Sequence, residues 1–405
     1  TKGAMCFPEK EEVLPALAFL NSPVVYSLLQ ALSPTVDFHE GPVGRLPYKS
    51  VQLSKKLAEV AVGISESDWD AYETSWNFKT LPLLSQGNDY GSLSATFTAL
   101  RAGWQSMTDE MQQLEEENNR IFIDAYGLQD ELTPEVPRHE ITLTCNPAFR
   151  YGPKVAPEDA EDRLLTDTMK EFISYAVGCI FGRYALEKPG LILANAGETL
   201  EDYLRQIPEP SFAADDDNVI PVLDGSWFED DIVSRFRRFL RVTFDDAHFE
   251  DNLRYIEAAI GRPLRDYFIK DFYKDQVQRY KKRPIYWQFS SPKGGFNALI
   301  YMHRYNHDTV STILNRYLRD YKSKLEAERT AQQRIEISAT ASQREKTQAL
   351  KEVTSISARL NELEAWERDV IFPLAAQRIE IDLDDGVKAN YPKFGKALKP
   401  ITGLS

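Results

Sequence analysis

Two apolar runs near the C-terminal end of the sequence constrain its fold more than any other feature. The first extends from Thr309 to about Thr340, and a polar Ala-Ser-Gln-Arg break at residues 341–344 separates it from the second. In the second run, apolar residues recur at alternating spacings of three and four: Val353, Ile356, Leu360, Leu363 and Val370. Glu367 occupies the one position in this pattern that is not apolar. This spacing is typical of a coiled-coil seam. Because the break between the runs is short, we expect an antiparallel helical hairpin.

The rest of the sequence favours an α+β fold that is predominantly helical. The length of 405 residues suggests more than one domain, and 42% hydrophobic residues are enough to bury sizeable cores. Strand signals gather after residue 284, where Tyr286, Trp287 and Phe289 alternate as on a half-buried strand. A turn at residues 291–295 follows, and we expect residues 296–307 to begin the helical end. The aromatic residues are interpreted as core rather than as surfaces that stack on bases.

A basic segment lies in the same part of an acidic chain. The net charge is −14, yet residues 270–330 hold 13 Lys and Arg against 6 Asp and Glu, a local balance of +7. This distribution excludes a chain that coats nucleic acid over its whole surface and permits a local basic face. We expect that face to be exposed and to meet nucleic acid or a protein mimic of it through five residues: Lys281, Lys282, Arg283, Lys293 and Arg304.

Other groups with metal-binding potential have plainer interpretations. His303 and His307 are four apart on an expected helix, but no third ligand follows from the sequence, so a core or interface role is favoured. The carboxylates of Asp215, Asp216 and Asp217 could hold a divalent ion as in a nuclease, but their loop is more typical of a solvated turn. The same holds for the Asp-Asp-Gly turn at residues 382–388. We therefore predict no catalytic, cofactor-binding or metal-binding residue in this chain.

An arginine group on the expected helix 230–241 leaves two alternatives. Phe236, Phe239 and Leu240 would anchor the helix in the core. Four arginines surround the other faces: Arg235, Arg237, Arg238 and Arg241. They could bind phosphate or pair with the neighbouring acids, and pairing is the favoured interpretation.

Three cysteines, Cys6, Cys145 and Cys179, are too widely spaced for a disulfide framework or a Cys-x-x-Cys metal site. A reducing, cytoplasmic setting fits them, and no apolar run is long enough to cross a membrane. The sequence begins Thr-Lys-Gly-Ala rather than with Met. We therefore expect it to be a fragment or a processed piece of a longer protein.

Several long motifs resemble a known family. Residues 68–78 (DWDAYETSWNF), 114–123 (LEEENNRIFI) and 126–136 (YGLQDELTPEV) are similar to parts of large single-chain adenine-specific DNA methyltransferases of the type IIG kind. Residues 281–310 with Leu314, and residues 381–394 (IDLDDGVKANYPKF), narrow the resemblance to the PglX family of BREX phage-defence systems. The resemblance covers nearly the whole chain.

The resemblance implies chemistry whose motifs we do not find here. The family needs a Gly-rich loop for S-adenosylmethionine and an Asn-Pro-Pro-Tyr turn that grips an adenine flipped out of the duplex. The nearest match is Asn146-Pro147-Ala148-Phe149, in which Ala148 replaces the second Pro, and we interpret residues 141–149 as a strand that enters a turn. S-adenosylmethionine is therefore implied only for the full-length protein, with catalysis upstream of this fragment.

With the resemblance, four segments are expected. Residues 1–60 would end a target-recognition-like region and 61–135 form a helical spacer; 136–280 would be a mixed α+β domain and 281–405 the basic strand-turn with the helical hairpin.

Three hypotheses for function remain. The first is the DNA-recognition and scaffold portion of the methyltransferase, with double-stranded DNA as partner. The second is a module that binds other BREX proteins or a DNA-mimicking phage inhibitor, and the third is a small hydrolase or nuclease.

Overall fold

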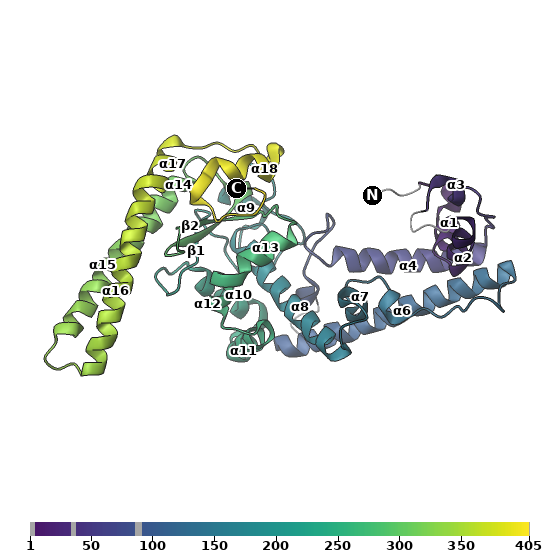
Figure 1. Ribbon diagram of the computed structural model, residues 1–405, viewed down its shortest axis with the longest axis horizontal. Coiled ribbons are helices and arrows are strands. Elements are labelled where there is room, and N and C mark those ends of the chain that lie inside the picture. Colours follow the sequence, from purple (N-terminus) through teal and green to yellow (C-terminus); the bar gives the residue numbers. More distant parts are fainter. Residues whose placement is uncertain (1–4, 34–37, 86–90, 405) are drawn as a thin grey trace. The chain divides into compact units, whose positions relative to one another are not determined.

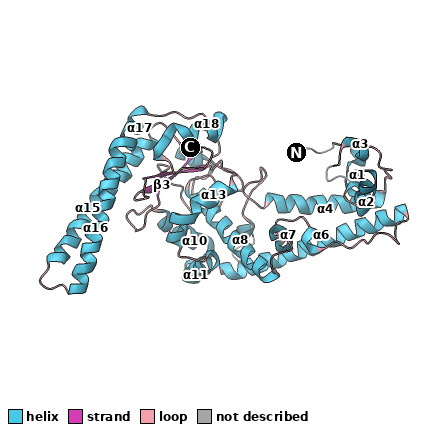
Figure 2. Cartoon of the chain, in the orientation of Figure 1, coloured by secondary structure: helices cyan, strands magenta, loops and turns pink. Residues whose placement is uncertain are grey.

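The computed structural model describes residues 5–33, 38–85 and 91–404. It is mostly helical with one small three-stranded antiparallel sheet, which confirms a predominantly helical α+β fold (Figures 1 and 2). The chain divides into two compact units. Unit 1 comprises Thr1–Phe78 and Ala95–Asp167, and unit 2 comprises Lys79–Ser94 and Thr168–Ser405. The four-segment division expected from the sequence stays a prediction.

Unit 1 is built from helices around an apolar cluster. Phe19 and Phe122 lie at its centre with ring centroids 5.6 Å apart, and the side chain of Asn118 donates a hydrogen bond to the carbonyl of Ala18. Pro23 begins its helix at the first position, where the missing N–H costs nothing. The helices are α1 (Val13–Leu20), α2 (Pro23–Leu32), α3 (Glu40–Val43), α4 (Gln52–Asp70), α6 (Leu93–Tyr126), α7 (Pro147–Tyr151) and α8 (Pro157–Ile180), of which α6 and α8 divide their residues between the units.

The segment that resembles an adenine-gripping motif is a helix cap. Asn146 is the N-cap of α7: its side-chain oxygen accepts the N–H of Ala148 at 3.2 Å, and its amide group donates to the carbonyls of Arg138 and Ile141. The buried carboxylate of Asp68 holds the same loop by accepting two backbone N–H groups, from Thr144 and Cys145. The strand expected over residues 141–145 was therefore wrong, because side-chain hydrogen bonds fix this backbone as a capped loop.

The sheet of unit 2 joins segments far apart in the sequence. Its strands are β1 (Ile220–Pro221), β2 (Tyr286–Ser290) and β3 (Asn297–Tyr301), in the order β1-β3-β2, with Tyr286 opposite Tyr301. The strand expected at residues 286–290 is confirmed, but both faces are buried rather than one. Where a helix was expected to start, β3 returns as the second strand of a hairpin.

Helices surround this sheet within unit 2. Phe236, Phe239 and Leu240 anchor α10 in the core as expected. The helices before the β2–β3 hairpin are α5 (Pro82–Ser85), α9 (Leu200–Gln206), α10 (Ile232–Phe244), α11 (Phe249–Ile260), α12 (Leu264–Tyr267) and α13 (Tyr273–Arg279), with a π-helical turn η5 (Phe268–Phe272) between the last two. Those after it are α14 (Thr309–Thr312), η7 (Ile313–Leu318), α15 (Arg319–Ile337), α16 (Gln343–Trp366), η8 (Glu367–Ile371), α17 (Phe372–Gln377) and α18 (Gly386–Asn390).

The predicted helical hairpin is confirmed. Helices α15 and α16 lie side by side and reverse direction at residues 338–342, where Ser342 and Glu345 form a capping box that starts α16 (Figure 1). Glu367, the residue in the missing seam position, accepts hydrogen bonds from Arg319 at 2.8 Å and Lys322 at 3.0 Å. An ion cluster therefore replaces one apolar layer of the seam.

None of the described helices is by itself long and apolar enough to cross a bilayer. The bent pair Lys10–Leu20 and Pro23–Leu32, which meet at 75°, reaches the required length and composition only when both helices are counted together. All three cysteines are free thiols.

Candidate nucleic-acid interface

The basic triplet Lys281, Lys282 and Arg283 immediately follows α13. The N–H of Lys282 donates to the carbonyl of Val277 at 2.7 Å and that of Lys281 to Gln278 at 3.0 Å, the paired bonds of a Schellman motif. Lys281 and Lys282 both have positive φ, at 49° and 63°. Glycine is the usual residue at such a position, since a side chain there is strained by about 1–2 kcal/mol. Two lysines are thus held in strained conformations at the surface.

These three cations have no acidic partner in the part of the chain that the structure describes. Lys281, Lys282 and Arg283 are exposed, as is Lys274 about two turns earlier on α13, and none forms an ion pair with any described residue. Later cations of the basic segment do form ion pairs: Arg316 with Asp216 and Asp217, Arg319 and Lys322 with Glu367, and Lys324 with Asp320. The free positive charge is therefore concentrated around the triplet.

Lys293 lies in the turn of the β2–β3 hairpin. Its side chain is exposed, while its backbone N–H donates to Glu362 at 2.7 Å and so fixes the turn against α16. Strand β2 separates this turn from the triplet, and a five-residue strand spans roughly 17 Å. Lys293 and the triplet are consequently at opposite ends of the hairpin and form no single cluster.

Arg304, which was expected to be exposed, is buried. Only 7% of its surface is exposed, and its guanidinium donates to the backbone carbonyls of Phe181 at 3.2 Å, Asp215 at 2.9 Å and Asp216 at 3.3 Å. The expectation of a surface position was wrong because these carbonyls satisfy the guanidinium inside the protein. Arg304 connects the end of β3 to the loop before β1.

His303 and His307 do not share a helical face. His303 is in the 3₁₀ turn η6 (Met302–Arg304), where its ring lies 4.8 Å from that of Tyr301, and His307 is in the exposed turn that follows. Burial and the nearby Arg183 lower the pKa of His303 to about 4. The expected helix was wrong, and His303 is an uncharged, largely buried imidazole.

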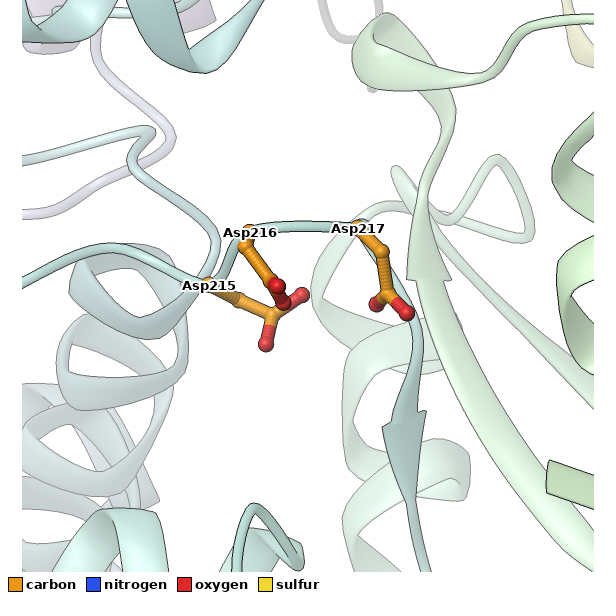
Figure 3. A group of neighbouring side chains, drawn as sticks. All are labelled: Asp215, Asp216 and Asp217. Carbon is orange, nitrogen blue, oxygen red and sulfur yellow. The ribbon is translucent and has the colours of Figure 1, made fainter. Parts of the chain in front are cut away.

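The three consecutive aspartates form a partly buried cluster. One oxygen from each of Asp215, Asp216 and Asp217 lies within 4.8 Å of the others (Figure 3). Asp215 is only 4% exposed, so the expectation of a plain solvated turn was wrong. Burial, together with the charge of Asp217, raises the pKa of Asp215 to about 7.

Arginines and a tyrosine occupy the surroundings of this cluster. Arg316 lies 2.8 Å from Asp217 and 3.3 Å from Asp216, and the hydroxyl of Tyr317 lies within hydrogen-bond distance of both Asp217 and Asp230. Positive side chains thus already balance much of the negative charge that a cation would need. We assign the cluster a structural role at the junction of β1 with the helices after β3.

The sequence left two roles open for the four arginines of α10, binding phosphate or pairing with neighbouring protein groups. Arg235 donates to the carbonyl of Ala213 at 2.6 Å, and Arg241 pairs with Asp246 at 2.7 Å. Arg237 and Arg238 are exposed and form no ion pair with a described residue. Pairing with protein groups therefore accounts for two of the four.

In the C-terminal acidic turn, Asp382 accepts the N–H of Asp384 at 3.0 Å, as a turn residue does.

Comparison with known proteins gives two long matches. The chain is 33% identical over 425 residues to the adenine-specific methyltransferase BrxX of Escherichia coli O9:H4 (strain HS), covering 99% of this chain and 34% of that protein. It is 35% identical over 422 residues to the adenine-specific methyltransferase PglX of Lacticaseibacillus casei (strain Zhang), covering 100% of this chain and 33% of that protein. No protein-family model matches. The resemblance is confirmed: this chain corresponds in sequence, over nearly its whole length, to about a third of an adenine-specific methyltransferase of the PglX and BrxX family.

Proposed function

We propose that this chain is the DNA-recognition and scaffold portion of a site-specific adenine-N6 DNA methyltransferase of a BREX phage-defence system. Its match to a third of two proteins named as adenine-specific methyltransferases carries the proposal. S-adenosylmethionine binding and methyl transfer belong to the remainder of the longer protein. The free cations around α13 and the β2–β3 hairpin supply the contacts to double-stranded DNA.

The structure supports a positioning role for these cations. Lysine and arginine side chains that reach phosphate oxygens fix the protein on the duplex without discriminating between bases. Lys281, Lys282 and Arg283 suit this role because no acid among the described residues pairs with them. The helical hairpin α15–α16 provides the scaffold, and the ion cluster at Glu367 ties α15 to the segment that follows α16.

The test of this proposal removes the three positive charges of the triplet. We expect Lys281, Lys282 and Arg283 changed together to Ala to weaken duplex binding at low salt by about tenfold or more, uniformly across DNA sequences. Fluorescence anisotropy with a labelled duplex measures the affinity. A matched control changes Arg334, Arg344 and Lys351 to Ala, three exposed cations of the hairpin that also form no ion pair with a described residue. An equal loss in both variants would mean that only net charge matters.

A second experiment concerns catalysis. Incubated with duplex DNA and S-adenosylmethionine, the chain alone is expected to transfer no methyl group to adenine. Measured transfer would contradict the assignment of the catalytic part to the remainder of the protein.

The charge distribution also favours a second candidate, a module that binds other BREX proteins or a DNA-mimicking phage inhibitor. A strongly acidic inhibitor would meet the same free cations that attract DNA. Loss of inhibitor binding in the triplet variant with duplex binding intact would select this candidate. Loss of both would leave the DNA proposal standing, because a mimic uses the surface of the molecule that it imitates.

A further inference from the structure

A buried guanidinium in unit 2 has no acidic partner among the described residues. Arg183 follows α8 and is 9% exposed, and it forms no ion pair with any residue that the structure describes. Its neighbours are tyrosines. Its Nε donates to the hydroxyl of Tyr184 at 3.0 Å, and the guanidinium lies 5.2 Å from the ring centroid of Tyr184 and 5.9 Å from that of Tyr280.

Burying a charge without a counter-ion is costly, and proteins normally pair such groups. Although burial opposes the charge, the surrounding tyrosines raise the pKa of Arg183 well above its ordinary value, so the side chain stays protonated. The two ring contacts recover part of the cost, since the face of an aromatic ring attracts a cation. They leave the terminal nitrogens without an anion to bind.

The surroundings of Arg183 suit a small anion. Neither Nη1 nor Nη2 of Arg183 is among the enclosed side-chain atoms that lack a hydrogen-bond partner. The hydroxyl of Tyr301 lies beside the guanidinium, and His303, which packs on Tyr301, has a buried Nδ1 without a hydrogen-bond partner among the described residues. Tyr280, whose ring faces Arg183, is followed directly by the free triplet. A largely buried donor thus packs against the residue that directly precedes the exposed basic triplet.

We propose that Arg183 is the floor of a phosphate-binding site whose rim is the triplet Lys281–Arg283. The planar guanidinium can present two parallel N–H groups to two phosphate oxygens, a geometry that gives specificity as well as affinity. The phosphate comes from a DNA backbone or from a free phosphate compound. The DNA source rests on the proposed function, whereas the free source does not.

The test compares wild type with Arg183→Met, which keeps a similar length and removes the charge. In sodium chloride, we expect the melting temperature of the variant to equal or exceed that of wild type, because an unpaired buried charge is lost. Inorganic phosphate at matched ionic strength is expected to raise the melting temperature of wild type by a few degrees and to leave Arg183→Met unchanged. Arg254→Met, at an exposed surface pair with Asp251, is the matched control and should respond to phosphate as wild type does.

Arg183→Lys keeps the charge, and it replaces Arg183→Met in this test if that variant folds poorly. It is expected to retain part of the phosphate effect, because an ammonium binds phosphate as a point charge. If the Arg183 variants melt lower than wild type and phosphate still stabilises them as much as wild type, Arg183 is a structural residue and the proposal is overturned.

Duplex binding by the same variants distinguishes the two sources. An affinity about tenfold weaker in Arg183→Met identifies a DNA phosphate, whereas unchanged duplex binding with a lost phosphate effect identifies a free phosphate compound. If wild type binds no duplex yet responds to phosphate through Arg183, the proposed function fails while this site stands.

Discussion

At the scale of single residues, Asp215 makes stability depend on pH in an unusual direction. Burial and the charge of Asp217 raise the pKa of Asp215 to about 7, whereas an unfolded aspartate titrates near 3.9. The folded chain therefore binds more protons than the unfolded chain between about pH 4 and about pH 7. The contribution of Asp215 to the free energy of unfolding consequently falls as the pH rises through this window, by at most about 1.4 kcal/mol per pH unit.

Asp215→Asn is expected to remove this dependence. The variant should be more stable than wild type at pH 8, where wild type must hold an ionised and largely unpaired carboxylate, and close to wild type at pH 5. Chemical unfolding at several pH values measures the difference. The control, Asp216→Asn, changes the more exposed neighbour that pairs with Arg316. A loss of stability in Asp215→Asn at pH 8 would show that its ionised form is the favoured one.

Residue-level predictions from sequence succeeded where exposure follows from local chemistry. Lys281, Lys282, Arg283 and Lys293 are exposed as expected, since turns lie on the surface. Arg304 was misplaced because its carbonyl partners come from residues more than 80 positions earlier. Arg183 escaped notice for a related reason, because nothing in the sequence around it indicates that Tyr280 and Tyr301, from distant segments, join Tyr184 in burying it.

At the scale of elements, the base of the hairpin α15–α16 depends on Glu367. Its side chain is 15% exposed and accepts bonds from Arg319 and Lys322. Although burial opposes ionisation, these bonds lower the pKa of Glu367 below its ordinary value. Glu367→Leu would restore the apolar seam but leave two cations unpaired, and hydrogen bonds to charged groups contribute about 1.5–3 kcal/mol. We expect the variant to lose about 1–3 kcal/mol of unfolding free energy.

Hydrogen exchange should localise the effect of Glu367→Leu to α15 and α16, and denaturant unfolding gives its size. Glu367→Gln, which keeps one acceptor oxygen, should lose less. Glu364→Leu changes an exposed acid in the last turn of α16 and should have little effect. Equal or higher stability in Glu367→Leu would mean that the seam prefers an apolar residue at this position after all.

The hairpin could be predicted because its periodicity is local, with successive seam positions three or four residues apart. Strand β3 could not, since Asn297–Tyr301 is buried on both faces and an apolar run without alternation does not distinguish a strand from a buried helix. Its pairing with β1 joins Ile220 to Leu299, and no local pattern reports such a contact. The sequence therefore indicated the helical class but not the complete sheet.

At the scale of the whole molecule, charge limits how the chain can hold DNA. The net charge is −14, and the ion pairs described above consume much of the local excess between residues 270 and 330. The free cations near the proposed interface are Lys274, Lys281, Lys282, Arg283 and Lys293. Each phosphate contact contributes about −0.9 to the slope of log affinity against log salt, so we expect a slope between about −3 and −5.

Anisotropy titrations at a series of potassium chloride concentrations measure this slope. Changing the triplet to Ala should make it shallower by about 2.7, three contacts at about 0.9 each, while the hairpin control variant keeps the wild-type slope. A wild-type slope steeper than about −8 would require more cations than this segment offers. DNA would then have to contact a second basic surface, and Arg237 and Arg238 on α10 would be the first residues to change.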